Sequence, residues 1–223
     1  MKSIMETTFN ILYLIIIWYL VIKMYTNKSK VSNSNKEVAS IFALAFLFLA
    51  IGDTGHVGFR VLAYINGGLE QNSVLLGYGK LATSITVTIF YACVVEMWRR
   101  RYNKPNNSLI YALFGLSAIR IVIMLLPGNE WTSAEPPFTW EILRNIPLMI
   151  VGLCMAFLLI HDAKKANDKT FQWIGITILI SYAFYIPVIL FARNIPAIGF
   201  LMIPKTIAYL AAAFIGYKGL YNV

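Results

Sequence analysis

Seven long apolar runs constrain this chain more than any other feature of its sequence. Each has the length, roughly 17–25 residues, that an α-helix needs to cross the hydrocarbon core of a bilayer. The connections between the runs are short, so the sequence predicts an all-α integral membrane bundle of seven transmembrane helices. The bundle is expected to form a single polytopic membrane domain over residues 1–223. The runs cover residues 9–25, 41–64, 74–98, 109–126, 140–160, 171–192 and 197–217.

Composition supports a membrane protein and argues against other classes. Charged residues make up only 13% of the chain and hydrophobic residues 59%, whereas soluble domains carry about 25% charged residues. The net charge of +9 is gathered in short clusters between the apolar runs. That distribution is typical of membrane topology and excludes nucleic acid as a partner. Both cysteines, Cys93 and Cys154, lie within apolar runs and are interpreted as small core residues.

The basic clusters predict the orientation of the bundle. Lys2 and Arg193 are the two basic residues in the segments on one side. The other side carries twelve, in the segments after the first, third and fifth runs and at the C-terminal end. By the positive-inside rule these twelve lie in the cytoplasm, so the N-terminus is predicted outside and the C-terminus in the cytoplasm. We expect a multi-pass protein of the cell (plasma) membrane, in contact with membrane lipids. The twelve residues are Lys23, Lys28, Lys30, Lys36, Arg99, Arg100, Arg101, Lys104, Lys164, Lys165, Lys169 and Lys218.

Eight charged residues fall inside the apolar runs, where a charge costs several kcal/mol and therefore marks a candidate functional site. Glu96, at the inner end of the third run, is expected to pair with the arginines that follow it. The other seven fall in the outer half of the predicted bundle. They are Asp53, Arg60, Lys80, Arg120, Glu141, Arg144 and Lys205.

The spacing of the polar residues in the second run places them on one helix face. Asp53, His56 and Arg60 are separated by three and four residues, which corresponds to one face of an α-helix. Glycines at positions 52, 55 and 58 lie beside them, where a neighbouring backbone can approach closely. In the last run, Lys205 and Tyr209 also share a face. Both faces are therefore expected to point into the bundle.

These residues predict a net-basic pocket in the outer half of the membrane. The excess of positive charge needs anionic partners or water, which a pocket for an anionic or amphipathic ligand supplies. Such a pocket suits a receptor-like or carrier-like protein. Two simpler interpretations stay open: Arg120 and Arg144 snorkel to the headgroups, or Asp53 and Lys205 form only a structural ion pair. The predicted ligand-binding residues are Arg60, Lys80, Arg120, Glu141, Arg144, Lys205 and Tyr209.

An enzyme is the alternative from another class. Asp53 and His56 could act together as general base and orienting group in a membrane-embedded hydrolase that acts on a lipid. No motif places a serine or cysteine nucleophile, so water would have to attack. A proton-coupled carrier that titrates the same two residues is a third possibility. A metal site is not expected, because the chain has two histidines and no cysteines at ligand spacing.

Seven helices with the N-terminus outside and a lysine in the last helix resemble the microbial rhodopsins. The resemblance covers the helix number and Lys205, which in that family corresponds to the lysine of a retinal Schiff base. The family has an acid four residues before this lysine, where this chain has Leu201. In the third run, where the family has a carboxylate, this chain has hydroxyl residues. No cofactor is therefore expected. The hydroxyl residues are Thr83, Ser84, Thr86 and Thr88.

Overall fold

Seven long helices account for nearly all of the structure. The computed structural model describes residues 2–221, with the side chains of residues 7–221, and every regular element in that range is helical. All seven helices are long and apolar enough to cross a membrane, so the chain is a multi-pass membrane protein. The helices are α1 (Lys2–Thr26), α2 (Lys36–Ile65), α3 (Ser73–Arg101), α4 (Ser108–Leu125), α5 (Phe138–Lys165), α6 (Lys169–Phe191) and α7 (Met202–Tyr221).

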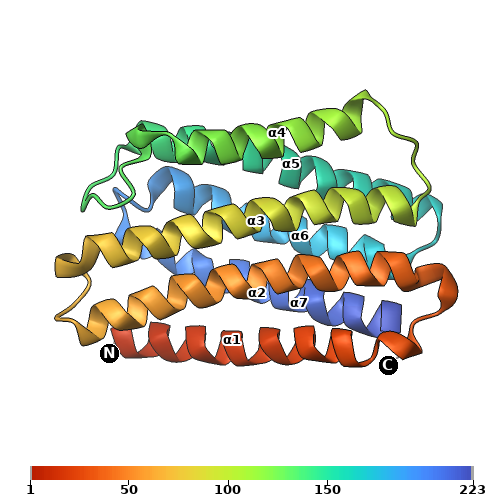
Figure 1. Cartoon of the computed structure of the whole chain (residues 1–223), viewed down its shortest axis with the longest axis horizontal. Coiled ribbons are helices and arrows are strands. Elements are labelled where there is room, and N and C mark those ends of the chain that lie inside the picture. The colour runs from red at the N-terminus through yellow and green to blue at the C-terminus, as the bar shows by residue number, and fades with distance from the viewer. Residues whose placement is uncertain (1, 222–223) are drawn as a thin grey trace.

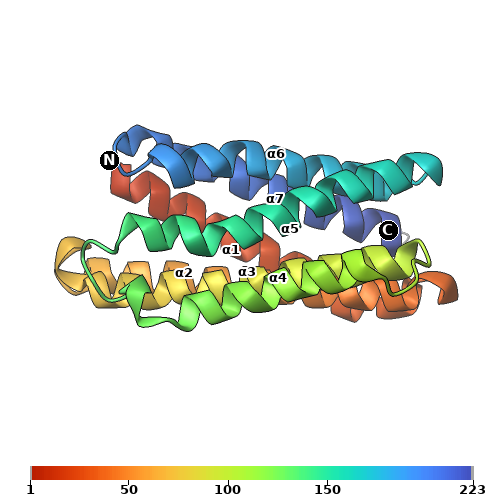
Figure 2. The same cartoon turned by 90° about the horizontal axis from the view of Figure 1, so that it is seen from above.

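The helices form a closed ring. Each helix contacts the next one in the chain, and α7 returns to contact α1 and α2. Figure 1 shows the helix axes running side by side, with the two ends of the described chain at opposite ends of the bundle. In Figure 2, α6 and α7 lie above α2, α3 and α4, with α5 between the two layers. We call the end at which α1 begins the N-terminal end, and the end at which α7 finishes the C-terminal end.

Several helices extend beyond the predicted apolar runs, mainly at the C-terminal end of the bundle. α2 begins five residues before the predicted start at position 41, and α5 ends five residues after position 160. α3 continues past position 98, where Glu96 pairs with Arg99 and Arg100 at N–O distances of 2.5 and 2.6 Å. This pairing confirms the prediction for Glu96. Polar residues thus continue the helices past the apolar segment, and hydropathy alone cannot detect such turns.

The twelve basic residues assigned to one side of the membrane lie in the connections and helix ends at the C-terminal end of the bundle. Some form ion pairs with acidic residues of α5 or of the connection that follows it. Arg101 pairs with Asp168 at 2.7 Å, and Lys104 pairs with Asp162 at 3.0 Å. The side chains of Lys2 and Glu6 lie outside the described part of the chain. The described structure therefore places this basic group at a single end of the bundle.

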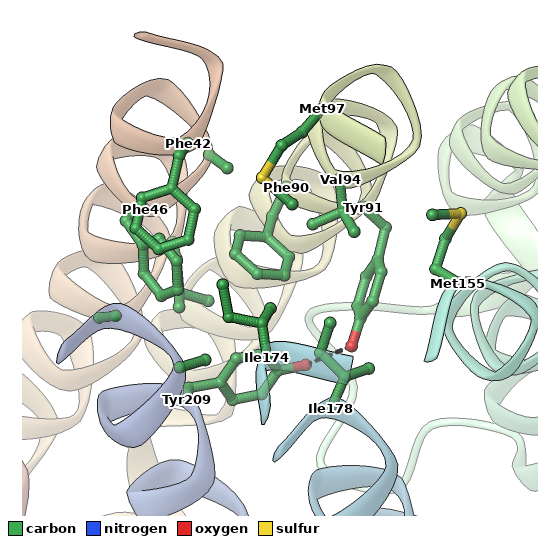
Figure 3. Close-up of a cluster of buried hydrophobic side chains, with 14 of the residues drawn as sticks. Phe42, Phe46, Phe90, Tyr91, Val94, Met97, Met155, Ile174, Ile178 and Tyr209 are labelled. Carbon is green, nitrogen blue, oxygen red and sulfur yellow. Dashed lines mark hydrogen bonds between the residues drawn. The ribbon is translucent and has the colours of Figure 1, made fainter. Parts of the chain in front are cut away.

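A compact aromatic and aliphatic core fills the middle and C-terminal part of the bundle (Figure 3). The rings of Phe46 and Phe90 meet edge to face with centroids 5.3 Å apart, and those of Phe90 and Tyr209 do so at 5.6 Å. The hydroxyls of Tyr91 and Tyr209 point toward each other and are hydrogen-bonded at 2.8 Å (Figure 3). Such geometry favours tight packing of aromatic side chains, so this part of the bundle is closely packed.

Glycine allows α2 and α3 to approach closely at two of the three predicted positions. A Cβ atom on Gly52 would overlap the Thr86 hydroxyl, and one on Gly55 would lie 3.3 Å from the Cβ atom of Ala82. A Cβ atom on Gly58 would have nothing within 4 Å. The expected close approach is therefore confirmed at Gly52 and Gly55 and is wrong at Gly58. The polar face of α2 is held against α3 by this packing.

Gly52→Ala is expected to destabilise the protein, because the added methyl group must displace Thr86 and the α3 backbone. Overpacking of this kind costs about 1–3 kcal/mol. Gly58→Ala is the matched control: it adds the same group to the same helix in open space and should be neutral or stabilising by up to about 1 kcal/mol. Thermal unfolding of the two variants in detergent measures the difference, and equal unfolding temperatures would contradict the packing described.

Candidate functional site: a cationic cavity at the N-terminal end

A large cavity opens in the N-terminal half of the bundle. Its volume is about 620 Å³, and all seven long helices contribute to its lining. This volume falls in the range of roughly 300–1,000 Å³ that is typical of pockets for small organic ligands. All nine residues that the sequence analysis singled out line this one cavity. They are Asp53, His56, Arg60, Lys80, Arg120, Glu141, Arg144, Lys205 and Tyr209.

The cavity lining is strongly cationic. Among the described residues, the acidic ones in the lining are Asp53 and Glu141, so six basic residues against two acidic ones leave four positive charges with His56 neutral. Charge of one sign in a low-dielectric cavity is costly unless water or a counter-ion enters. Arg193 belongs to this lining although the sequence analysis assigned it to a connection. The basic residues are Arg60, Lys80, Arg120, Arg144, Arg193 and Lys205.

Arg120 is part of the framework of the cavity and does not reach the membrane surface. Its side chain is 2% exposed. Its Nε donates to the carbonyl of Arg144 on α5 at 2.8 Å, and its Nη1 donates to the carbonyl of Ser84 on α3 at 2.9 Å and to the Thr88 hydroxyl. The carbonyl of Arg144 lies in the turn before Pro147, where proline disturbs the helix hydrogen bonds. Snorkelling is therefore wrong for Arg120, which joins α3, α4 and α5.

Arg144 is also buried, with 6% of its surface exposed. Its guanidinium lies 4.4 Å from the centroid of the Trp131 ring and donates to the side-chain oxygen of Asn129 at 3.3 Å. Glu141, one turn earlier on α5, is 3.9 Å away. The connection between α4 and α5 therefore folds back over the cavity and holds this arginine. Snorkelling is wrong for Arg144 as well.

Asp53 is bound by hydroxyl groups from two other helices. One carboxylate oxygen accepts a hydrogen bond from Tyr13 on α1 at 2.5 Å, and the other accepts from Thr83 on α3 at 3.0 Å. Within the described part of the chain, no ion pair joins Asp53 to Lys205 and no hydrogen bond joins it to His56. The predicted structural ion pair is therefore not formed, and neither is the carboxylate–histidine pair of the hydrolase alternative. The Nδ1 atom of His56 is buried and has no hydrogen-bond partner among the described residues.

Lys205 lies against the faces of two tyrosine rings. Its Nζ atom is 4.6 Å from the centroid of Tyr185 and 5.6 Å from that of Tyr209. Tyr185 is itself fixed by donating to the side-chain oxygen of Asn145 at 3.1 Å. Aromatic faces stabilise a cation only partly, by about 0.5–2 kcal/mol. The ammonium group therefore keeps most of its capacity to bind an anion.

Lys80 is the second cation of the lining without a carboxylate at ion-pair distance among the described residues. It is exposed and lies on α3 in the cavity lining, within electrostatic range of Glu141 and Arg144. Among the described residues, neither Lys80 nor Lys205 lies within ion-pair distance of a carboxylate. His56 lies within electrostatic range of both lysines. The two ammonium groups on α3 and α7 thus form no ion pair with a carboxylate of the described residues.

The floor of the cavity is closed. Tyr182 donates to the carbonyl of Leu148 at 2.9 Å, and its ring centroid lies 5.7 Å from that of Tyr91, which is hydrogen-bonded to Tyr209. Beyond this layer begins the core of Figure 3. Among the described residues, none from the C-terminal end of the bundle lines the cavity. The cavity is therefore accessible from the N-terminal end and is blocked toward the other.

Sequence reasoning did not identify four residues that shape the cavity. Tyr13, Trp131, Asn145 and Arg193 all line it. Asn145 and Arg193 alone belong to a pattern that is visible in the sequence. The tetrapeptide Arg-Asn-Ile-Pro occurs at 144–147 and again at 193–196. Both arginines of this repeat line the cavity, although the rest of the two segments differs. Tyr13 and Trp131 are ordinary residues of an apolar run and a connection, so only their contacts across the fold identify them.

No group of three or more His, Cys, Asp or Glu side chains in the described part of the chain is arranged to hold a metal ion. The chemistry that the lining offers is instead the binding of negative charge by ammonium and guanidinium groups beside hydroxyls. Comparisons of the chain with protein-family models, with curated proteins and with solved structures find no match. The function has to be inferred from the cavity itself.

Proposed function

We propose that this chain is a receptor-like or carrier-like membrane protein that binds an anionic ligand in the cationic cavity. The observation that carries the proposal is the pair Lys80 and Lys205, whose charges lie in the cavity without a carboxylate partner among the described residues. A half-buried cation such as Lys205 is costly at membrane depth unless it is paired. A bound carboxylate or phosphate offsets that cost and gains charge-assisted hydrogen bonds.

We further propose that the cavity opens to the outside of the plasma membrane. The twelve basic residues at the C-terminal end of the bundle favour that end as the cytoplasmic one. An odd number of spans then puts the N-terminal end, with the cavity, outside. A ligand would reach the site from outside the cell, which suits a receptor or the outward-facing state of a carrier.

Cysteine labelling tests the orientation. Ala134→Cys, in the connection between α4 and α5, should react with a membrane-impermeant thiol reagent on intact cells, and Ala166→Cys, between α5 and α6, should not. Both positions are exposed, and Cys93 and Cys154 are first replaced by alanine. Ala166→Cys should become labelled once the membrane is permeabilised. The reverse pattern would place the cavity on the cytoplasmic side.

Binding without turnover is the better supported class of function. Hydrolysis by Asp53 and His56 requires the carboxylate to orient the imidazole, but the Asp53 oxygens are hydrogen-bonded to Tyr13 and Thr83. Proton-coupled transport requires a polar path toward the cytoplasm, and the core below Tyr209 is apolar. No observation therefore favours either alternative over binding.

A ligand panel tests the proposed function. Detergent-purified protein is heated with inorganic phosphate, acetate, alkyl phosphates and alkyl carboxylates, and with uncharged alcohols of the same chain lengths. Anions should raise the unfolding temperature, since a ligand that binds only the folded state stabilises it by about 2.7 kcal/mol at one hundred times its Kd. Mass spectrometry of each mixture then detects conversion. The proposal fails if no anion stabilises the protein more than its alcohol does.

A further inference from the structure

The two sides of the cavity mouth differ in chemistry. Arg60, Lys80 and Arg144 lie on the side formed by α2, α3 and α5. The opposite side is formed by the end of α6, the start of α7 and the short 3₁₀ helix η5 (Pro196–Leu201) between them. Figure 2 shows that α6 and α7 form a layer apart from α2, α3 and α4. Apart from Arg193, the lining on this second side is apolar from position 188 to position 203. It consists of Val188, Ile189, Ala192, Pro196, Gly199, Phe200, Met202 and Ile203.

The chemical character of the cavity lining also changes with depth. Lys205 lies deeper than the apolar rim on the same helix, and it is flanked by Asp53 and Arg120 within electrostatic range. The deep part of the lining is mixed: Leu49, Val87 and Leu148 lie there together with Arg120, Tyr182 and Tyr209. An alkyl chain directed to the floor would therefore meet charged and polar groups as well as apolar ones. The longest apolar stretch of the lining runs along the end of α6 and the start of α7, interrupted by Arg193.

From this arrangement we infer that the ligand is an anionic amphiphile with one alkyl chain, bound with its head group inward. A carboxylate or phosphate head group lies between Lys80 and Lys205, and the chain lies against the rim residues Val188, Met202 and Ile203. The inference rests on the proposed function and names the class of ligand. The cavity volume of about 620 Å³ suits a head group with one chain, whereas a two-chain phospholipid is larger. Carboxylate and phosphate head groups both carry negatively charged oxygens, so the cationic lining can bind either of them.

A chain-length series measures the contribution of the rim. Alkyl phosphates and alkyl carboxylates of one to ten carbons are bound to the purified protein by equilibrium dialysis against empty detergent micelles. The micelles subtract the partitioning of each probe into detergent. Affinity should rise up to about fourfold with each added methylene, because each buried methylene contributes a transfer gain of that size. The rise should stop once the chain extends beyond the rim, and the series with the tighter binding identifies the preferred head group.

A matched pair of variants on α7 tests where the chain lies. Ile203→Thr makes the rim more polar, whereas Ile207→Thr makes the same change one turn later on α7, where Ile207 is 50% exposed and is not part of the cavity lining. Octyl phosphate should bind several-fold more weakly to Ile203→Thr, and methyl phosphate should be unaffected. Ile207→Thr should bind both probes as the wild type does. Equal losses in both variants would place the chain elsewhere.

The outcomes separate this inference from the proposed function. If short and long anions bind equally well, the amphiphile is excluded and an anion-binding cavity stands. If octanol binds as tightly as octyl phosphate, the charge of the head group is irrelevant and both ideas fail. If the affinity grows with chain length and Ile203→Thr alone weakens it, the amphiphile is supported.

Discussion

Lys205→Met is expected to weaken the binding of an anionic ligand by about 10- to 100-fold, because it removes a charge-assisted hydrogen bond worth about 1.5–3 kcal/mol. The same change should leave the unliganded protein equally stable or more stable. Methionine keeps the contacts with the rings of Tyr185 and Tyr209 and removes a half-buried ammonium that has no carboxylate partner among the described residues. Equilibrium dialysis gives the affinity, and thermal unfolding in detergent gives the stability.

Lys218→Met is the matched control for this variant. Lys218 lies in the last turn of α7, at the C-terminal end of the bundle, and its Nζ is 4.8 Å from the centroid of the Phe214 ring. Removing that charge should change neither the affinity nor the unfolding temperature appreciably. If Lys205→Met lowers the stability and keeps the affinity, Lys205 is a structural residue and the cavity has no anion site at that depth.

Arg120→Met should have the opposite profile, with a large loss of stability. The variant removes the donors that serve the carbonyls of Arg144 and Ser84 and the hydroxyl of Thr88. Each buried polar group left without a partner costs about 1–3 kcal/mol. We therefore expect the free energy of unfolding to fall by about 2–4 kcal/mol, which thermal unfolding in detergent detects.

Two further arginine variants establish the cause of that loss. Arg120→Lys keeps the charge but cannot reproduce the donor geometry of the guanidinium, so it should recover only part of the stability. Arg193→Met removes an exposed arginine at the mouth, which donates to the carbonyl of Pro136 at 3.4 Å, and should change the stability by less than about 0.5 kcal/mol. Equal effects of Arg120→Met and Arg193→Met would mean that the hydrogen bonds across α3, α4 and α5 contribute little.

The sequence predicts the helices and the gathering of charge for the same physical reason. Apolar runs of membrane-spanning length have few alternatives to a transmembrane helix. Within such runs, a charge is so costly that it turns toward other polar groups, and the spacing of Asp53, His56 and Arg60 reveals the face that does so. That is why residues far apart in the sequence, such as Lys80 and Lys205, could be assigned together before their positions were known.

The partners of those charges could not be predicted, because most of them are neutral groups on other helices. Arg120 binds the backbone carbonyls of Arg144 and Ser84, and every residue of the chain carries a carbonyl. Asp53 takes its hydrogen bond from Tyr13, one of thirteen tyrosines. Opposite charge suggested Lys205 as the partner of Asp53, and that assignment was wrong. Packing decides which hydroxyl or carbonyl comes within reach, and a periodic pattern carries no such information.

The stability of the bundle and its proposed function draw on different parts of the cavity wall. Arg120, Asp53 and Tyr182 are fully engaged with groups on neighbouring helices, so they fix the shape of the wall. Lys80 and Lys205 contribute charge without such partners among the described residues. A binding site commonly contains groups of this second kind, which lower the stability of the empty protein and are neutralised by the ligand.

The most direct test of an anion-binding cavity compares octyl phosphate with octanol on the wild type and on a Lys80→Met/Lys205→Met double variant, by equilibrium dialysis against empty micelles. The two probes share their alkyl chain, so the difference between them reports the charge of the head group. The wild type is predicted to bind octyl phosphate at least about tenfold more tightly than octanol, and the double variant should bind the two equally. An unchanged preference for octyl phosphate in the double variant, or no preference in the wild type, would contradict an anion site between these lysines.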